Sequence, residues 1–470
     1  MYDLAVLFLY FLVIIAIGVL ASKGTSTIDS FYLAKNKIHW SLLLISLIAT
    51  ETSSLTFLSL PTLGYKSSFS FLSLALGFIL GRIFTAIYLV PMYMQGRYVS
   101  LYSFVGNVLG KPMERSVSFT FLVARVIGDG IRLFATSIPF VLILQTRIPV
   151  TVDTLYINIF VLFVISFVTI LYTVSGGFTA VVWTDALQFL IYIASAGIAI
   201  YFLLVGQPQI KPEWFYPTEV LDFKSPYFIA YGLIGGFFLT IGSHGTDQMM
   251  VQRILATKKE ADGKKVLILS GIIVFFQFAL FLTIGILLKN LYITETKIGD
   301  KVFSEFIISK IPAPFLGLIL AGLLASAMST LSSTINSLSL TINVNFQFGK
   351  NVSPKKLSIF WGLILFFATV IPFLLGENSR KPLIEIALTV SGYIWGPTLG
   401  IFLLYLVSQH SKSKFLSKNL AFSSYWISLV LLIAIEQSYK FPFTLLVPIG
   451  LLCFSGVYYL FFLFKKISGR

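Results

Sequence analysis

The stretch Ser46-Leu-Ile-Ala-Thr-Glu-Thr-Ser-Ser-Leu-Thr56 decides the fold, because it sets a cluster of polar residues inside an apolar run that covers about residues 40–60. A run of about 20 residues is long enough to cross the hydrocarbon core of a membrane as a helix. Backbone groups that lose their partners in lipid cost several kcal/mol, so a break at this depth is tolerated only inside protein or beside a cavity. We therefore expect a broken membrane helix that is enclosed by other helices.

A second interrupted run covers residues 227–248 and contains Gly235-Gly236 followed by Thr240-Ile-Gly-Ser-His-Gly-Thr246. The first interrupted run is the second apolar span of the chain and this one is the seventh, so each opens a block of five spans. Breaks at matching positions in two halves indicate the inverted repeats of secondary transporters, whose binding site lies between the broken helices. For either span alone, close helix packing through Gly, Ser and Thr explains the residues equally well.

The remaining apolar runs predict an all-α membrane protein that occupies the whole chain, residues 1–470. Hydrophobic residues make up 57% of the chain and charged residues 11%, whereas soluble domains carry about a quarter charged residues. About thirteen spans are expected, at residues 2–22, 40–60, 70–94, 116–145, 155–173, 178–206, 227–248, 265–289, 312–346, 357–375, 383–407, 420–436 and 441–464. No length remains for a separate soluble domain.

The basic residues predict how the chain is inserted. They give a net charge of +15, but they lie in short connections and form no patch with interleaved aromatic residues, which argues against nucleic-acid binding. With the N-terminus outside, 20 of the 34 basic residues lie on the inner side, 11 on the outer side and three within spans. The positive-inside rule then predicts a multi-pass protein of the plasma (inner) membrane, with its N-terminus outside and its C-terminus in the cytoplasm.

A stripe of hydroxyl groups runs along the span at 312–346. Residues at helical spacing share one face of this span, namely Ser326, Ser329, Thr330, Ser333 and Ser337, with Ser332 on the flank. Small hard cations take oxygen ligands, and neutral hydroxyls with freed carbonyls can replace water around such an ion. A single serine in a span more often bonds back to its own helix, but the complete stripe favours a cation-binding role.

Ionisable residues inside the spans need a partner or a wet cavity. Seven are found there, namely Glu51, Arg82, Arg125, Asp129, Arg132, Asp185 and Asp247. Arg125 and Arg132 both lie within about one turn of Asp129, which can neutralise only one of them. The surplus arginine is a candidate to bind a substrate carboxylate through its planar fork. An equally favoured alternative is that Glu51 pairs with it and both are structural.

Other charged and reactive residues narrow the function. Asp247 and Arg253 are expected to form a structural pair at the end of the seventh span. Three scattered histidines and the single Cys453 form no zinc cluster, and no GxxxxGK[ST] loop or nucleophile–base pair is present. We therefore expect neither an enzyme nor an ATP-driven pump, and no nucleotide or nucleic acid as a partner. His244, in the second interruption, is a candidate gate, although packing is its commoner role.

Four motifs follow one another along almost the whole chain. They are Phe31-Tyr-Leu-Ala leading into the Ser46 to Ser54 stretch, Gly176-Gly-Phe-Thr-Ala-Val-Val-Trp-Thr-Asp-Ala-Leu-Gln188, Gly245-Thr-Asp-Gln-Met-Met-Val-Gln-Arg253, and the Ser326 to Ser337 stripe. Together they resemble the sodium:solute symporter family, which includes sodium/glucose, sodium/proline and sodium/sialic acid carriers. The resemblance implies a LeuT-type fold with core inverted repeats at about 40–206 and 227–407, and extra helices at 2–22, 420–436 and 441–464.

The resemblance also implies which residues bind the cargo. A principal sodium site would use the carbonyls of Ala49, Thr52 and Ser326 and the hydroxyls of Ser329 and Thr330. A second sodium site, present in some relatives, would use Asp185, Ser332 and Ser333, so that one or two sodium ions would be co-transported. Substrate-binding candidates are Glu51, Ser53, Thr56, Arg132 and Thr240, with Ser243 and His244 at gating positions.

The substrate positions favour an anionic solute. Ser53 and Thr56 look like the hydroxyl positions of the sialic acid carriers, and Arg132 falls near their carboxylate-binding arginine, whereas Glu51 departs from that pattern. Thr56 and Ser243 replace a glutamine and a tyrosine of the sugar carriers, which argues against a sugar.

We therefore expect a sodium-coupled symporter, embedded in a lipid bilayer, that imports a small organic solute. The solute would be a carboxylate, such as a sialic acid or another monocarboxylate. Sodium would join the first broken span to the hydroxyl stripe and so preform the solute pocket. Proton coupling through Glu51 or Asp185, sodium symport of a neutral amino acid or sugar, and a passive channel are the alternatives.

Overall fold

The computed structural model describes the chain as a bundle of helices. The described residues are 2–21, 27–34, 37–96, 98–145, 153–205, 210–291, 301–370, 383–410 and 416–467, and no strand occurs among them. The helices are α1 (Tyr2–Leu20), α2 (Ile28–Leu33), α3 (Trp40–Glu51), α4 (Ser54–Ser67), α5 (Leu72–Phe84), α6 (Val90–Met94), α7 (Leu101–Leu109), α8 (Lys111–Gln145), α9 (Thr154–Val205), α10 (Ile229–Gly245), α11 (Gln248–Leu255), α12 (Glu260–Leu291), α13 (Lys301–Lys310), α14 (Phe315–Asn345), α15 (Pro354–Ala368), α17 (Leu383–His410), α18 (Lys418–Tyr439) and α19 (Leu446–Ile467).

The structure has fewer membrane-crossing helices than the thirteen expected spans, and three of those spans account for the difference. Among the described residues, nine helices are long and apolar enough, or ten if the bent pair of α3 and α4 is one span. α9 holds two expected spans because Gly177, at φ +54°, kinks it. A Cβ at Gly177 would lie 2.7 Å from the Phe31 carbonyl oxygen, so glycine is needed there. The run at 227–248 is divided between α10 and α11, and α15 has only 15 residues.

Both predicted breaks are present. α3 ends at Glu51 and α4 begins at Ser54, and the two helices are bent by 63°. The two residues between them have extended backbone, with φ/ψ of −79°/96° at Thr52 and −102°/172° at Ser53. In the second interruption, Asp247 is also extended, and its side chain caps α11 by accepting a hydrogen bond from the Met249 N–H at 2.9 Å. The first span is therefore broken where predicted. In the second span the helix continues through Gly235 and Gly236 to Gly245, and the break lies at Thr246 and Asp247, at the end of the predicted interruption.

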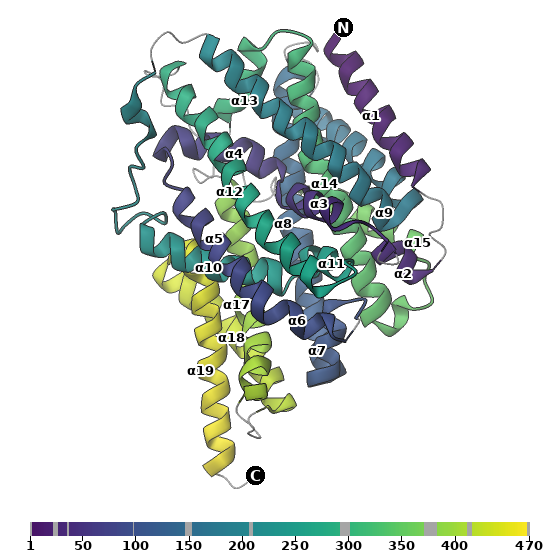
Figure 1. The fold of residues 1–470 in the computed structure, drawn as a ribbon, viewed down its shortest axis with the longest axis vertical. Helices are drawn as coiled ribbons and strands as arrows, with labels where there is room; N and C mark the ends of the chain where they lie inside the picture. The colour runs from purple at the N-terminus through teal and green to yellow at the C-terminus, as the bar shows by residue number, and fades with distance from the viewer. Residues whose placement is uncertain are drawn as a thin grey trace.

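The hydroxyl-rich helix lies at the centre of the bundle. In the most apolar 18-residue window of α14, 83% of the residues are buried, compared with 17% in α1 and 28% in α18 and α19. α14 packs most extensively against α9, and α10 against α5. The hydroxyl groups of α14 consequently face protein, while the three less buried helices lie at the periphery (Figure 1).

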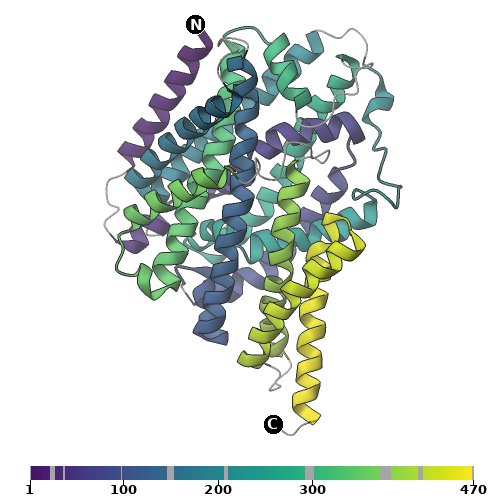
Figure 2. The ribbon, with the colours of Figure 1, turned by 180° about the vertical axis from the view of Figure 1, so that it is seen from behind.

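The termini lie at opposite ends of the long axis. α1 begins at one end, and α19 extends beyond the bundle at the other, in both the front and the rear view (Figures 1 and 2). The two breaks lie between these ends (Figure 1).

Candidate solute pocket and sodium site

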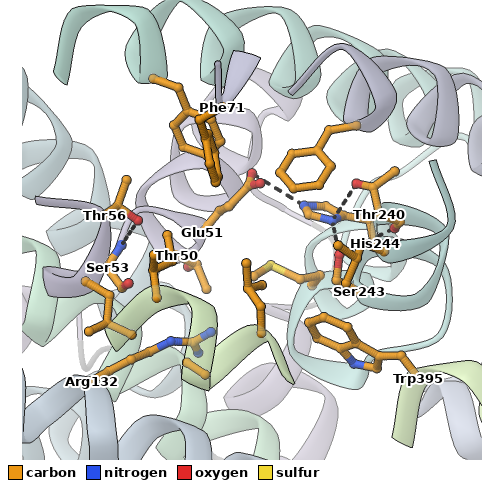
Figure 3. Close-up of a pocket in the computed structure, with 18 of the residues that line it drawn as sticks. Thr50, Glu51, Ser53, Thr56, Phe71, Arg132, Thr240, Ser243, His244 and Trp395 are labelled. Atoms are coloured by element: carbon orange, nitrogen blue, oxygen red, sulfur yellow. Dashed lines mark hydrogen bonds and ion pairs between the residues drawn. The ribbon is translucent and has the colours of Figure 1, made fainter. Parts of the chain in front are cut away.

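A pocket lies between the two broken helices and is enclosed by α5, α8, α12 and α17 (Figure 3). Its polar wall comes from the two breaks and from α8, and consists of Thr50, Glu51, Ser53, Thr56, Arg125, Arg132, Thr240, Ser243 and His244. Its apolar wall is formed by Leu55, Phe71, Phe78, Leu239, Met250, Phe278, Ile384, Ala387, Leu388 and Trp395. The structure thus brings all seven residues predicted for substrate binding and gating to one pocket.

Glu51 is held by an arginine that sequence reasoning did not assign to it. Both Glu51 carboxylate oxygens accept hydrogen bonds from Arg82 Nη2, at 2.5 and 2.6 Å, and Arg82 Nη1 donates to Ser270 Oγ at 2.6 Å. Arg82 is fully buried, whereas the Glu51 side chain keeps 12% of its surface exposed. The alternative in which Glu51 neutralises an arginine of the 116–145 span is therefore wrong.

The arginines of α8 are each paired with a different aspartate. Arg132 Nη1 donates to Asp129, and Asp129 also accepts from Thr334 Oγ1 of α14 at 2.6 Å. Arg125 Nη2 lies 2.6 Å from Asp247 Oδ2, whereas Arg125 Nη1 lies 3.9 Å from Asp129 Oδ2. The prediction of a surplus arginine in α8 is wrong, because Asp247 comes from the second break to neutralise Arg125.

The expected pairing of Asp247 with Arg253 is also wrong. Asp247 points toward α8 and α17, where Trp395 Nε1 donates to its Oδ2 at 3.2 Å. Arg253 instead lies 3.3 Å from Asp185 Oδ2 of α9, and both side chains are fully buried. The helix cap explains the separation, since the carboxylate that accepts from the Met249 N–H faces away from the next turns of α11.

Arg132 keeps hydrogen-bonding capacity although its charge is paired. Its Nε is buried without a hydrogen-bond partner, and its side chain extends beneath Ser53 and Thr50 into the space between the two breaks (Figure 3). An unpaired buried donor is unfavourable by about 1–3 kcal/mol, so a ligand oxygen placed there would relieve that penalty. On the same wall, the Ser53 N–H donates to Thr56 Oγ1 at 3.3 Å.

The last turn of α10, beside the second break, presents a histidine to the pocket. His244 Nδ1 lies 2.8 Å from Ser243 Oγ and 3.3 Å from Thr240 Oγ1. His244 Nε2 faces Glu51 Oε2 at 3.5 Å (Figure 3). The gating candidates are thereby connected to Glu51 across the pocket.

A second, small cavity lies beside the first break and is lined mainly by neutral groups. Four residues predicted for the principal sodium site line it, namely Ala49, Thr52, Ser326 and Ser329, together with Gln188, Phe189, Tyr192 and Ala325. The Ala49 carbonyl is released from the α3 ladder because the backbone is extended at Thr52 and Ser53, and the Ser53 N–H donates to Thr56 Oγ1 instead. The hydroxyl of the fifth residue, Thr330, lies 3.1 Å from the Ser326 carbonyl of its own helix and 3.3 Å from the Thr50 carbonyl, and so it connects α14 to the break.

The residues predicted for a second sodium site gather around Arg253. Asp185 accepts from Ser329 Oγ at 2.7 Å and from Ser46 Oγ at 2.5 Å, while Arg253 Nη2 bonds to Ser333 Oγ as well as to Asp185. The hydroxyl of Ser332 bonds back to the Ser329 carbonyl at 3.0 Å. Asp185 and Ser333 are thus brought together, and Ser332 is turned toward its own helix.

Sequence reasoning missed several residues that support these two cavities. Gln277 of α12 donates to Thr52 Oγ1 at 2.6 Å, Arg82 fixes Glu51, and Trp395 holds Asp247. Arg82 carried a usable signal, because a charge inside an apolar span demands a partner. Gln277 and Trp395 carried none, since neutral residues are common in spans. Among the described residues, no group of three or more His, Cys, Asp or Glu side chains could hold a resident metal ion.

Two broken helices around a central pocket, with a small cavity between one break and the hydroxyl-rich helix α14, define a LeuT-type secondary transporter. The chain belongs to the sodium:solute symporter family, whose model matches residues 31–414. It is therefore a multi-pass membrane protein that couples solute transport to sodium.

Curated relatives carry different solutes. The sodium/sialic acid symporter NanT of Aliivibrio fischeri is 26% identical over 85% of this chain and 81% of its own length. The rabbit (Oryctolagus cuniculus) sodium/glucose cotransporter 1 is 26% identical over 86% and 67%, and the human sodium/iodide cotransporter is 24% identical over 86% and 65%.

Solved structures share the fold. A substrate-bound, outward-open sodium-coupled sialic acid symporter matches with a TM-score of 0.81 at 22% identity, over 97% of this chain and 96% of that one. The nucleobase-cation symporter Mhp1 in a closed conformation matches with a TM-score of 0.60 at 14% identity, over 91% and 92%.

Proposed function

We propose that this symporter imports a small organic solute that bears a carboxylate, such as a sialic acid or another monocarboxylate, across the plasma membrane. The observation that carries the proposal is Arg132, which lines the pocket together with Ser53 and Thr56 and whose Nε has no hydrogen-bond partner. A carboxylate can accept from this nitrogen and from a neighbouring hydroxyl at once. Sialic acid symporters among the relatives and the solved structures support this class of solute.

At the opposite wall, Glu51 and His244 would bind the uncharged polar part of the solute. The exposed face of Glu51 can accept from a hydroxyl or amide N–H, and Thr240 adds a further hydroxyl to this wall. Glu51 is fixed by Arg82, so it binds without a change in its own position. Ser243 and His244 would gate the pocket because they line it from the last turn of α10, directly before the second break.

The transported sodium is proposed to bind at the carbonyls of Ala49, Thr52 and Ser326 and the hydroxyls of Ser329 and Thr330. The small cavity beside the first break and the released Ala49 carbonyl support this assignment. Bound sodium would join α14 to α3, and α3 contributes Thr50 and Glu51 to the wall of the solute pocket. Sodium binding then favours the conformation that accepts solute, and by linkage solute must tighten sodium binding by the same factor.

A second sodium at Asp185, Ser332 and Ser333 is proposed as a weaker site, because Arg253 already occupies one Asp185 oxygen. A Hill coefficient above one for sodium-driven uptake, falling to one in Asp185→Asn, would support two ions. A coefficient of one in both proteins would contradict the second site and leave the principal site standing.

The N-terminus is proposed to lie outside the cell and the C-terminus in the cytoplasm. Basic residues are concentrated in the connections on the side of the C-terminus, and the two termini lie at opposite ends of the bundle. The core inverted repeats are proposed at about residues 40–206 and 227–407, since each begins with a broken helix.

The proposal is tested by uptake into proteoliposomes of labelled carboxylates, amino acids, sugars and sialic acid, with and without an inward sodium gradient. Sodium-driven uptake of a carboxylate is expected, and Arg132→Ala should abolish it, while Arg132→Lys should restore only part of it because the fork is lost. Arg115→Ala, at an exposed position on the same helix, is the matched control and should transport normally. Uptake of a neutral solute that is insensitive to Arg132→Ala would overturn the substrate class, and uptake driven by pH but not sodium would overturn the coupling ion.

A further inference from the structure

A buried glutamine with an unused oxygen lines the small cavity beside the first break. Gln188 lies on α9, one turn beyond Asp185, and only 1% of its surface is exposed. Its Oε1 has no hydrogen-bond partner in the structure, although Gln188 shares the cavity with four of the five residues proposed to bind sodium. An orphaned buried acceptor is unfavourable unless a partner completes it in some state of the molecule.

The orientation of this amide is set by its other end. Gln188 Nε2 donates to the Tyr10 hydroxyl of α1 at 3.1 Å, and the Tyr10 hydroxyl donates in turn to Met328 Sδ at 3.5 Å. In this arrangement the Tyr10 oxygen accepts from the Gln188 NH₂ group, and the Gln188 carbonyl oxygen is left without a partner.

We propose that Gln188 Oε1 is a ligand of the transported sodium, in addition to the backbone carbonyls and hydroxyls assigned above. An amide oxygen is a hard, neutral donor of the kind that such cations prefer. A neutral ligand strengthens the site without adding a charge that would hinder release of the ion. This inference rests on the proposed sodium site, and it adds α9 and, through Tyr10, α1 to the helices that respond to sodium.

The alternative is that Gln188 only fills space between α1 and α9. Gln252 of α11 provides a matched comparison, because it is also fully buried and its Oε1 is also without a partner. Gln252 Nε2 bonds to Asn336 Oδ1 and the Tyr32 carbonyl, each at 2.7 Å, and Gln252 does not line the small cavity. Replacement of either glutamine by methionine keeps the length of the side chain and removes the amide.

The experiment measures sodium binding without transport. The full-length protein is purified in detergent, and the sodium concentration at half-maximal rise in melting temperature is determined at constant ionic strength with potassium. For Gln188→Met this concentration should rise by about tenfold or more, as expected for the loss of a group that supports a bound metal. Gln252→Met should melt at a lower temperature but keep the wild-type sodium midpoint.

Two further variants separate the possible failures. If Gln188→Met does not fold, Gln188→Asn keeps the amide but withdraws its oxygen by one methylene, and it should also weaken sodium binding. Ser329→Ala with Thr330→Ala tests the underlying sodium site. Weakened sodium binding in that double variant, together with Gln188 variants that shift the midpoint no more than Gln252→Met does, would overturn the role of Gln188 alone. An unchanged midpoint in the double variant would overturn the sodium site itself.

Discussion

The two breaks occupy matching positions in the chain but differ in what their backbone is bonded to. At the first break, the residues between α3 and α4 are Thr52 and Ser53, and the Ala49 carbonyl has lost its helical partner. At the second break, Asp247 caps α11 with its own side chain and is held from outside by Arg125 and Trp395. The first break leaves the Ala49 carbonyl open, whereas the Asp247 carboxylate at the second break is satisfied by its own cap and by neighbouring helices.

The two breaks are therefore expected to have different functions. Open carbonyls beside neutral hydroxyls can exchange water for an ion, whereas a capped and ion-paired break holds α10, α11, α8 and α17 together. Sodium binding is accordingly expected to depend on the first break, and stability on the second.

Asp247→Ala should have the largest effect, a loss of stability at the second break. It leaves Arg125 buried and without its closest partner, because Asp129 is 3.9 Å away and already engaged by Arg132. Loss of one member of a buried pair is destabilising by about 3–5 kcal/mol, so the free energy of unfolding in micelles should fall by that amount. The double variant Asp247→Ala with Arg125→Met should recover much of it. A single variant as stable as the wild type would show that this break is not held by its ion pair.

Thr330→Val should weaken sodium binding with little loss of stability. The hydroxyl of Thr330 is a proposed sodium ligand and donates to the Thr50 carbonyl at the first break. A loss of about 1.4 kcal/mol corresponds to a tenfold rise in the sodium concentration that half-saturates uptake. Thr341→Val is the matched control, because Thr341 is equally buried on α14 but bonds only within its helix, to Ser337. Equal sodium dependence in the two variants would contradict the assignment.

Thr56→Val should affect the solute rather than the ion. It removes a pocket hydroxyl and the partner of the Ser53 N–H, while the carbonyls proposed for sodium are retained. A single lost hydrogen bond of about 1 kcal/mol predicts a KM for the solute that is roughly fivefold higher, with the sodium dependence unchanged. Thr62→Val, two turns further along α4, should leave both unchanged. A shift in sodium affinity alone would place Thr56 with the cation instead of the solute.

Glu260→Ala should have the smallest effect, and it is the exposed-pair comparison for Asp247→Ala. Glu260 pairs with Lys264 at 2.6 Å on α12, but both side chains are more than a third exposed. Exposed pairs one helical turn apart contribute about 0.3–0.5 kcal/mol, so the free energy of unfolding should change by no more than that. A loss as large as that of Asp247→Ala would mean that burial does not explain the difference between the two pairs.

The helices and both breaks could be predicted from the sequence because their signals are local. A polar or glycine-rich interruption in an apolar run by itself indicates a break that must be enclosed by protein. The stripe on α14 follows from helical spacing alone. The same holds for the pocket, since broken helices at matching positions bring their interruptions together. Charge partners could not be predicted in this way, because they depend on how distant helices are placed.

Asp247 illustrates that limit. Arg253 is its neighbour in sequence, but the turn that caps α11 directs the Asp247 carboxylate toward Arg125, which lies more than a hundred residues earlier. Glu51 was likewise assigned to α8, whereas Arg82 of α5 holds it. Gln188 belonged to a recognised motif, yet its unused oxygen became visible only when the neighbouring helices were in place.

The central claim is that sodium at the first break prepares the solute pocket. The most direct test is equilibrium binding of labelled sialic acid, and of any carboxylate found in the uptake panel, to purified protein at increasing sodium with potassium as the balancing ion. Solute affinity should rise with sodium in the wild type and should lose that dependence in Ser329→Ala with Thr330→Ala. Solute binding that is equally tight with and without sodium would contradict the account.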